Sequence, residues 1–103
     1  MAERVNAISI ANNFVKECIQ NGIPVKEAIL FGSYAKGNAD ENSDVDLALI
    51  ADSFGKNIIE NNRQTALINW HYADVEVHHF SPAEFTLDLP FINEIKRTGI
   101  KIY

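Results

Sequence analysis

The stretch "FGSYAKGNADENSDVDLALI", from Phe31 to Ile50, contains the residues that decide the fold and point to a function. Gly32 and Ser33 follow an apolar run that is typical of a buried strand. "SYAK" is long enough for one helical turn, and the small polar residues after it indicate a loop. Asp44 and Asp46 then open a second apolar run. The stretch therefore predicts two strands joined through a glycine-serine turn.

The two aspartates predict a cation site. Residues i and i+2 of a strand share a face and lie roughly 6.6 Å apart along the chain. At an effective dielectric constant near 20, two carboxylates at that distance repel by about 2.5 kcal/mol. Glu76 on the next predicted strand would reach the same face if the strands are neighbours, and Asp74 is a rival for that place. Such a group is explained by Mg²⁺, which prefers carboxylate and phosphate oxygens.

The glycine-serine step predicts the complementary anion site. Glycine allows the backbone to approach a ligand closely, and a helix that starts at Ser33 directs free N–H groups toward an anion. Ser33 adds a hydroxyl donor. Lys36 is a candidate for contact with phosphate, although a lysine in a turn also faces solvent without any ligand. His78, on the predicted face of Glu76, is either an assistant to metal or substrate or an ordinary strand histidine.

The rest of the chain predicts a single α/β (α+β) domain over residues 1–103, with helices packed on a small mixed sheet. The apolar residues expected on the second long helix are Ile58, Ile59, Ala66, Leu67 and Trp70, with Trp70 and Tyr72 as packing residues. The predicted elements are a helix over 4–20, strands over 25–31 and 44–50, a helix over 57–70, a strand over 72–80, a helix start capped by Ser81 and Glu84, a helix over 91–97 and an edge strand over 100–103.

Composition excludes several classes of protein. The 103 residues carry a net charge of −5, which counts against strong non-specific binding to nucleic-acid backbone. Cys18 is the only cysteine, so an intrachain disulfide and a cysteine zinc cluster are excluded, and a buried thiol is expected. We find neither a signal-peptide core nor an apolar run long enough for a bilayer, and therefore expect a cytoplasmic protein without a membrane contact.

The spacing of these motifs resembles that of a known family. Gly32-Ser33, ten intervening residues and then Asp44-Val45-Asp46 resemble the signature of the minimal nucleotidyltransferase family, in the DNA polymerase β superfamily. "FINEIKRTGIKIY" is also similar to family sequences, and "VEVHHFSPAEF" is similar to the strand that carries the third carboxylate. The resemblance covers roughly residues 25–103 and is most specific at the Gly-Ser and Asp-x-Asp spacing.

The resemblance implies a metal-dependent nucleotidyltransferase. Asp44, Asp46 and Glu76 would be catalytic and would bind two Mg²⁺ ions, although many relatives have aspartate as the third acid. Gly32, Ser33 and Lys36 would contact the nucleotide. The reaction implied is transfer of a nucleoside monophosphate, with AMP from ATP expected, to a hydroxyl acceptor.

An alternative function is also implied by the family. Small members are often paired with helical ribonuclease toxins of the HEPN type, and some add AMP to a tyrosine of the partner. Because no further acceptor-binding domain follows the core fold in this sequence, a HEPN-type partner or a second copy in a homodimer is expected to complete the site. A catalytically silent domain is disfavoured by the intact Gly-Ser and Asp-x-Asp residues.

Overall fold

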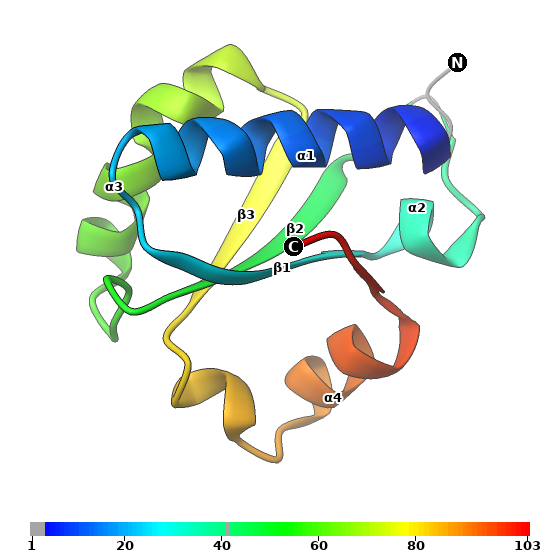
Figure 1. The fold of residues 1–103 in the computed structure, drawn as a ribbon. Helices are drawn as coiled ribbons and strands as arrows, with labels where there is room; N and C mark the ends of the chain where they lie inside the picture. Colours follow the sequence, from blue (N-terminus) through cyan, green and yellow to red (C-terminus); the bar gives the residue numbers. More distant parts are fainter. Residues whose placement is uncertain (1–3, 41) are drawn as a thin grey trace.

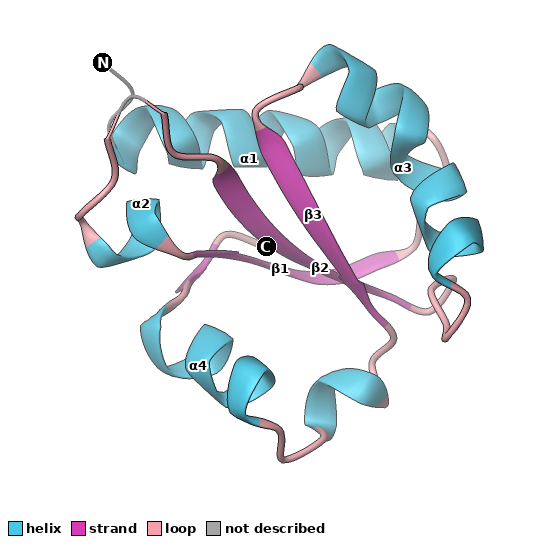
Figure 2. Cartoon of the chain, turned by 180° about the vertical axis from the view of Figure 1, so that it is seen from behind, coloured by secondary structure: helices cyan, strands magenta, loops and turns pink. Residues whose placement is uncertain are grey.

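The computed structural model describes residues 4–40 and 42–103, which form a four-stranded sheet with helices on both faces (Figures 1 and 2). Helices α1 and α3 cover one face, and α4 lies on the other (Figure 1). The elements in chain order are α1 (Arg4–Gln20), β1 (Val25–Phe31), α2 (Ser33–Lys36), β2 (Val45–Ala51), α3 (Ile58–His71), β3 (Val75–Phe80), the 3₁₀ helix η1 (Glu84–Thr86), α4 (Pro90–Thr98) and β4 (Ile100–Lys101).

The sheet is mixed, as predicted. Its strand order is β3-β2-β1-β4, with β1 antiparallel to both β2 and β4, and β2 parallel to β3. The parallel pair requires a crossover connection, and α3 supplies it. The predicted fold class is confirmed. Within the described ranges, the structure contains no helix that is both long enough and apolar enough to cross a bilayer.

The alternation of side chains along β2 divides the interior into two cores. Val45, Leu47 and Leu49 belong to the core beneath α1 and α3. Ala48 and Ile50 point to the opposite face and pack in the core beneath α4. This is the alternation that the apolar pattern of the sequence predicts. It leaves Asp46 on the α4 face, at the edge of that core.

Helix α1 forms as predicted. Cys18 is fully buried in the larger core. Burial, followed by the negative charge of Glu17, raises the pKa of the thiol to about 12, so the thiol stays protonated. The helix is followed by Gly22, whose φ of 84° is a left-handed conformation that favours glycine.

Helix α3 corrects the prediction of its packing face. Ile58, Ile59, Leu67 and Trp70 are exposed, at 72%, 75%, 81% and 84% of their full surface. The buried face consists instead of Asn61, Thr65 and Ile68.

Hydrogen bonds explain why polar residues occupy the buried face of α3. The Asn61 amide donates to the Gly55 carbonyl and accepts from the Gly55 N–H, at 2.7 and 3.0 Å. The Thr65 hydroxyl lies 2.9 Å from His79 Nε2. Because these groups are satisfied internally, the helix can present its polar side to the core. The predicted packing role of Trp70 is wrong, whereas Tyr72 does pack, edge-on against Phe14.

The C-terminal part follows the predicted capping pattern. The Ser81 hydroxyl accepts from the Glu84 N–H, and the Glu84 carboxylate accepts from the Ser81 N–H, which is a capping box. The helix that it opens is a short 3₁₀ helix, and α4 starts separately at Pro90. At Gly99 a Cβ atom would overlap Ile29 Cγ2, so glycine allows β4 to reach β1.

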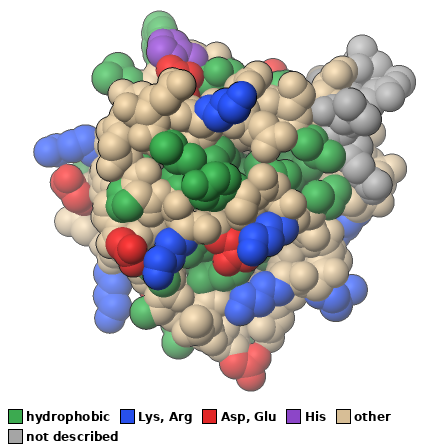
Figure 3. Space-filling model, viewed as in Figure 1, with side chains coloured by type: hydrophobic (Ala, Val, Ile, Leu, Met, Phe, Trp, Pro, Cys, Tyr) green, Lys and Arg blue, Asp and Glu red, His purple; other side chains and the backbone are tan. Residues whose placement is uncertain are grey.

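Charged side chains of both signs are mixed on the face of the molecule shown in Figure 3. On the face shown in Figure 3, lysine and arginine side chains are interspersed with acidic ones, and hydrophobic side chains gather between them. With a net charge of −5, this distribution agrees with the expectation of weak non-specific binding to nucleic acid, which remains a prediction.

Candidate active site

The candidate site lies at one end of the strands, where β1 ends and β2 and β3 begin. Phe31, the last residue of β1, pairs with Asp46 of β2. Asp46 in turn is the partner of Glu76 in the parallel pairing of β2 with β3. Two carboxylates are therefore placed side by side by the register of two strands that are far apart in sequence.

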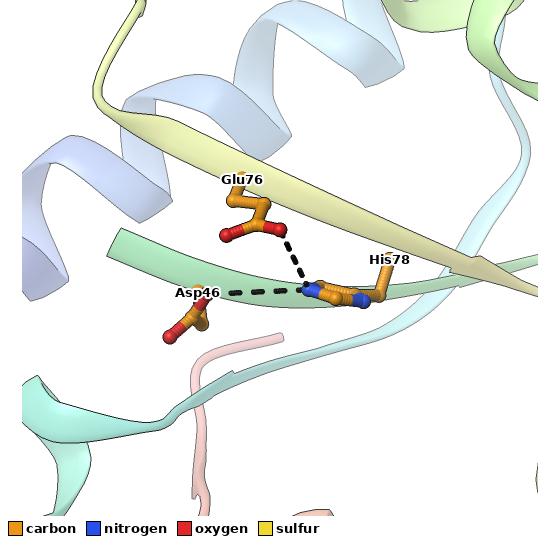
Figure 4. Close-up of side chains that lie close together, drawn as sticks. All are labelled: Asp46, Glu76 and His78. Carbon is orange, nitrogen blue, oxygen red and sulfur yellow. Dashed lines mark ion pairs between the residues drawn. The ribbon is translucent and has the colours of Figure 1, made fainter. Parts of the chain in front are cut away.

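Asp46 and Glu76 converge with His78 (Figure 4). One donor atom from each of these side chains lies within 4.8 Å of the other two. His78 Nε2 is 4.0 Å from Asp46 Oδ1 and 3.8 Å from Glu76 Oε1. Asp46 and His78 are partly buried, whereas Glu76 is exposed. The cluster is thus reached from solvent on the side of Glu76.

The electrostatics of the cluster favour a bound positive charge. Burial, the negative charge of Glu76 together with a side-chain hydrogen bond to it, and the charge of Asp44 raise the pKa of Asp46 from 3.8 to about 6. Burial lowers the pKa of His78, against the opposite effect of Glu76, so the neutral imidazole is favoured. Each carboxylate therefore lacks a close cation among the described residues that surround it.

Gly32 brings the backbone directly against this cluster. Its φ of 75° lies in the left-handed region. A Cβ atom at Gly32 would overlap Asp46 Oδ2, so the Asp46 carboxylate would have to move. Glycine is therefore required for two reasons, conformation and space. This contact places the glycine-serine turn directly beside Asp46.

Ser33 and Lys36 lie on the one-turn helix that follows. Ser33 begins α2, and its carbonyl accepts hydrogen bonds from Gly37 N–H and from Asn38 N–H. Lys36 Nζ forms an ion pair with Glu94 Oε1 on α4, at 3.3 Å. Lys36 therefore links α2 to α4 at the surface, and contact with a phosphate would have to compete with Glu94.

Asp44 and Asp74 are exposed and lie just outside the cluster, before the first residues of β2 and β3. Both line a pocket of about 280 Å³, together with residues of α1, α2 and the preceding loop. The charge of Asp44 still acts on Asp46. The structure therefore unites Asp46 with Glu76 and leaves Asp44 beside them, with Asp74 as the neighbour of Asp44.

The donor set fits a divalent cation. Two adjacent carboxylates, a neutral imidazole and a backbone turn without a side chain surround one point at the end of these strands. Hard cations take carboxylate oxygens, and imidazole nitrogen is a common further ligand. His78 is the residue whose role the sequence left open. Its i+2 spacing from Glu76 is the signal that places it here.

Part of the chain is similar in sequence to a known protein. A segment of 56 residues is 43% identical to a protein of Methanocaldococcus jannaschii that is provisionally named protein adenylyltransferase MJ1305. The match covers 53% of this chain but only 38% of that protein, so the chain spans about two fifths of the relative's length.

Solved structures share the fold. A provisionally named nucleotidyltransferase from Sulfolobus solfataricus superposes with a TM-score of 0.73 at 16% identity, over 95% of this chain and 80% of the other. A toxin–antitoxin structure with AMP-PNP superposes with a TM-score of 0.63 at 21% identity, over 88% of this chain and 71% of the other. At these identities the likeness shows the fold alone.

The family itself is shown by the sequence match. Residues 11–102 match the family described as the nucleotidyltransferase domain. This range contains the glycine-serine turn, both aspartates, Glu76 and His78. The predicted resemblance to minimal nucleotidyltransferases, an enzyme family, is confirmed. The chain belongs to the nucleotidyltransferase domain family.

Proposed function

We propose that this domain transfers a nucleoside monophosphate, with ATP as the expected donor and AMP as the transferred group, to a hydroxyl acceptor. One observation carries the proposal: the Gly32 backbone is pressed against Asp46, which stands beside Glu76 on the next strand. A nucleoside triphosphate needs both halves of such a site, because its phosphates require N–H donors and its cation requires carboxylates.

The proposed reaction is a displacement at the α-phosphorus. The acceptor oxygen forms a bond to that phosphorus, and the bond to the bridging oxygen breaks. Pyrophosphate leaves with the electron pair, and the hydroxyl proton passes to a carboxylate of the cluster. Divalent cations, when bound, supply charge neutralisation of the phosphates and of the attacking oxygen. No covalent intermediate with the protein is required, so positioning and electrostatics are the contributions of the chain.

The residues divide into two groups in this proposal. Asp46 and Glu76 would hold the cation, and Asp44 at the adjoining pocket would extend the carboxylate set for a second Mg²⁺ ion. Gly32 and Ser33 would present backbone N–H groups and a hydroxyl to the β- and γ-phosphates. Asp46 is partly buried and rigidly paired, and it is therefore the residue on which the site depends most.

The test is transfer from α-labelled ATP with Mg²⁺ or Mn²⁺, using candidate acceptors that include the protein itself. Asp46→Asn keeps the shape of the side chain and removes its charge. We expect transfer to fall by on the order of 100-fold or more. Asp52→Asn is the matched control, because Asp52 is an exposed aspartate in the turn after β2, outside the cluster. Equal activity of both variants would refute the proposed site.

A second candidate function is binding of a helical protein partner of the HEPN type. The specific observation is the exposed apolar side of α3, formed by Ile59, Leu67 and Trp70, with exposed Ile58 at the start of the helix. Trp70 also lines a pocket with Ala66, Asn69 and Ala73. Isolated exposed apolar residues are ordinary, but three large ones on one side of a helix are typical of a contact surface. A fold relative solved as a toxin–antitoxin pair supports this partner class.

Co-expression with the neighbouring gene product tests the second function. We expect Trp70→Ser together with Leu67→Ser to abolish co-purification, whereas Asp46→Asn should leave binding intact and abolish AMP transfer to the partner. Self-association that is lost in the Trp70 variant would instead identify a homodimer. Unchanged binding by the Trp70 and Leu67 variant would exclude the exposed side of α3 as the contact surface.

A further inference from the structure

The imidazole of His78 points between the two carboxylates (Figure 4). Its Nε2 atom is nearly equidistant from Asp46 Oδ1 and Glu76 Oε1, at 4.0 and 3.8 Å. Both distances are too long for a hydrogen bond. His78 Nε2 therefore faces both carboxylates without a hydrogen bond to either, as a third ligand of a cation held between them would.

The ring of His78 is held in this orientation by aromatic neighbours. Phe31 of β1 meets it edge-on, with ring centroids 5.1 Å apart, and Phe91 of α4 lies 5.5 Å away on the ring centroids. Across the strand pair the partner of His78 is Ala48, whose small side chain leaves space for the ring. Packing thus positions Nε2, and rotation away from the cluster would break both aromatic contacts.

His79 shows what a histidine with a purely structural role looks like in this chain. It points to the opposite face of β3, where its Nε2 lies 2.9 Å from the Thr65 hydroxyl and its ring packs edge-on against Phe54. Among the described residues, His78 has no comparable hydrogen-bond partner for its ring. The difference favours a ligand of another kind for His78.

We propose that His78 is a ligand of the cation held by Asp46 and Glu76, and that it makes the site prefer a first-row transition-metal ion such as Mn²⁺ to Mg²⁺. Mg²⁺ takes oxygen ligands and retains its waters, whereas imidazole nitrogen adds affinity for first-row metals. The inference rests on the proposed function only for the placement of the cation. It concerns which ion the site selects, and it names His78 as the residue that decides.

The experiment measures metal binding without nucleotide or acceptor. Free Mn²⁺ is followed by electron paramagnetic resonance during titration of the protein, and Mg²⁺ affinity is obtained by competition. We expect Mn²⁺ to bind at least about 10-fold more tightly than Mg²⁺. His78→Asn should remove most of this preference by weakening Mn²⁺ binding, with little effect on Mg²⁺. His71→Asn is the control, because His71 is exposed at the end of α3.

A second variant and a measurement on the unaltered protein distinguish the loss of a metal ligand from misfolding of His78→Asn. His78→Asp supplies an oxygen ligand in place of nitrogen, so Mg²⁺ binding should persist while the preference for Mn²⁺ disappears. In the unaltered protein, substoichiometric Mn²⁺ should broaden the imidazole proton resonances of His78 before those of His71.

The outcomes separate this inference from the proposed function. If His78→Asn retains the full preference for Mn²⁺, or if the His78 resonances broaden no earlier than those of His71, the inference is wrong. AMP transfer that still depends on Asp46 would leave the proposed function standing in that case. Mn²⁺ preference that depends on His78, without any transfer, would support the inference and contradict the enzyme.

Discussion

At the scale of single residues, the site is built from groups that would lower stability if they had no ligand. Asp46 carries a raised pKa because it is buried beside Glu76, and Gly32 holds a left-handed backbone against it. Like charges in contact and backbone strain persist at functional sites, where binding energy compensates them. The first two predictions test these features separately.

Gly32→Ala should disable the site. The new Cβ atom would overlap Asp46 Oδ2, and φ is 75°, so we expect a loss of about 1–3 kcal/mol of stability and loss of Mn²⁺ binding. Gly22→Ala is the matched control: its φ is 84°, but no atom lies within 4 Å of the added Cβ. It should lose about 1 kcal/mol and bind metal normally. Metal binding by the Gly32 variant equal to that of the Gly22 variant would contradict the close-contact argument.

The pH dependence of stability should reveal two opposed titrations. Burial, with Glu76 and Asp44, raises the pKa of Asp46 from 3.8 to about 6, so its contribution to stability falls as pH rises through this window. Burial, with the charge of His78, lowers the pKa of His79 from 6.5 to about 4, so its contribution rises with pH from about 4 to 6.5.

Asp46→Asn should therefore change the pH profile in a defined direction. Without metal, the variant loses the falling Asp46 contribution and keeps the rising contributions of His78 and His79, so its stability should increase more steeply between about pH 4 and pH 6 than that of the unaltered protein. At neutral pH it should be more stable by about 1–2 kcal/mol, a figure reduced for the partial exposure of Asp46. Urea unfolding followed by circular dichroism measures both effects, and parallel profiles would contradict the raised pKa.

At the scale of elements, α3 shows how a polar helix face can be the buried one. Asn61 is 6% exposed and closes the turn before the helix through its two bonds to Gly55. Apart from Ile68, its large apolar residues are exposed, so hydrophobicity alone predicts the wrong buried face for α3. Internal hydrogen bonding decides the rotation of α3 about its axis, since an unsatisfied amide in the core would be expensive.

Replacement of two neighbouring asparagines should show which side of α3 is buried, because only the loss of a buried asparagine lowers stability strongly. Asn61→Ala removes both bonds to Gly55 and should lower the free energy of unfolding by about 2–3 kcal/mol. Asn62→Ala, one position along on the exposed side, should change it by less than about 0.5 kcal/mol, in the stabilising direction, because alanine favours helix. Thermal unfolding measures the difference. Equal losses in the two variants would show that the rotation of α3 is wrong.

At the scale of the whole molecule, the two proposed functional surfaces lie on opposite faces of the sheet. The carboxylate cluster faces the α4 side of the sheet, and the exposed apolar residues of α3 lie on the other layer. A partner bound to α3 would therefore leave the cluster open to nucleotide. This separation allows binding and transfer to be disabled independently.

Trp70 reports on the α3 surface, because it is the only tryptophan and is 84% exposed. We expect the emission spectrum of the isolated protein to be that of indole in water, with strong quenching by iodide. Contact with a partner or a second copy should shift the emission to the blue and protect it from iodide, because the ring then leaves water. A blue-shifted spectrum in the dilute, monomeric protein would contradict the exposed position of Trp70.

Local patterns in the sequence determined most of the elements and the family. The alternation along β2, the capping box at Ser81 and the Gly-Ser to Asp-x-Asp spacing each depend on residues that are close together in the chain. Such patterns express backbone geometry and side-chain period, which a sequence displays directly.

Only the tertiary structure decided which side chains meet. The parallel register of β2 with β3 pairs Asp46 with Glu76, whereas Asp74 precedes the first residue of β3 and lies outside the cluster. The same register brings His78 to the cluster. The outward rotation of α3 has the same origin. Register and rotation depend on contacts between segments far apart in the chain, so the energy that selects them appears only when the two cores are packed.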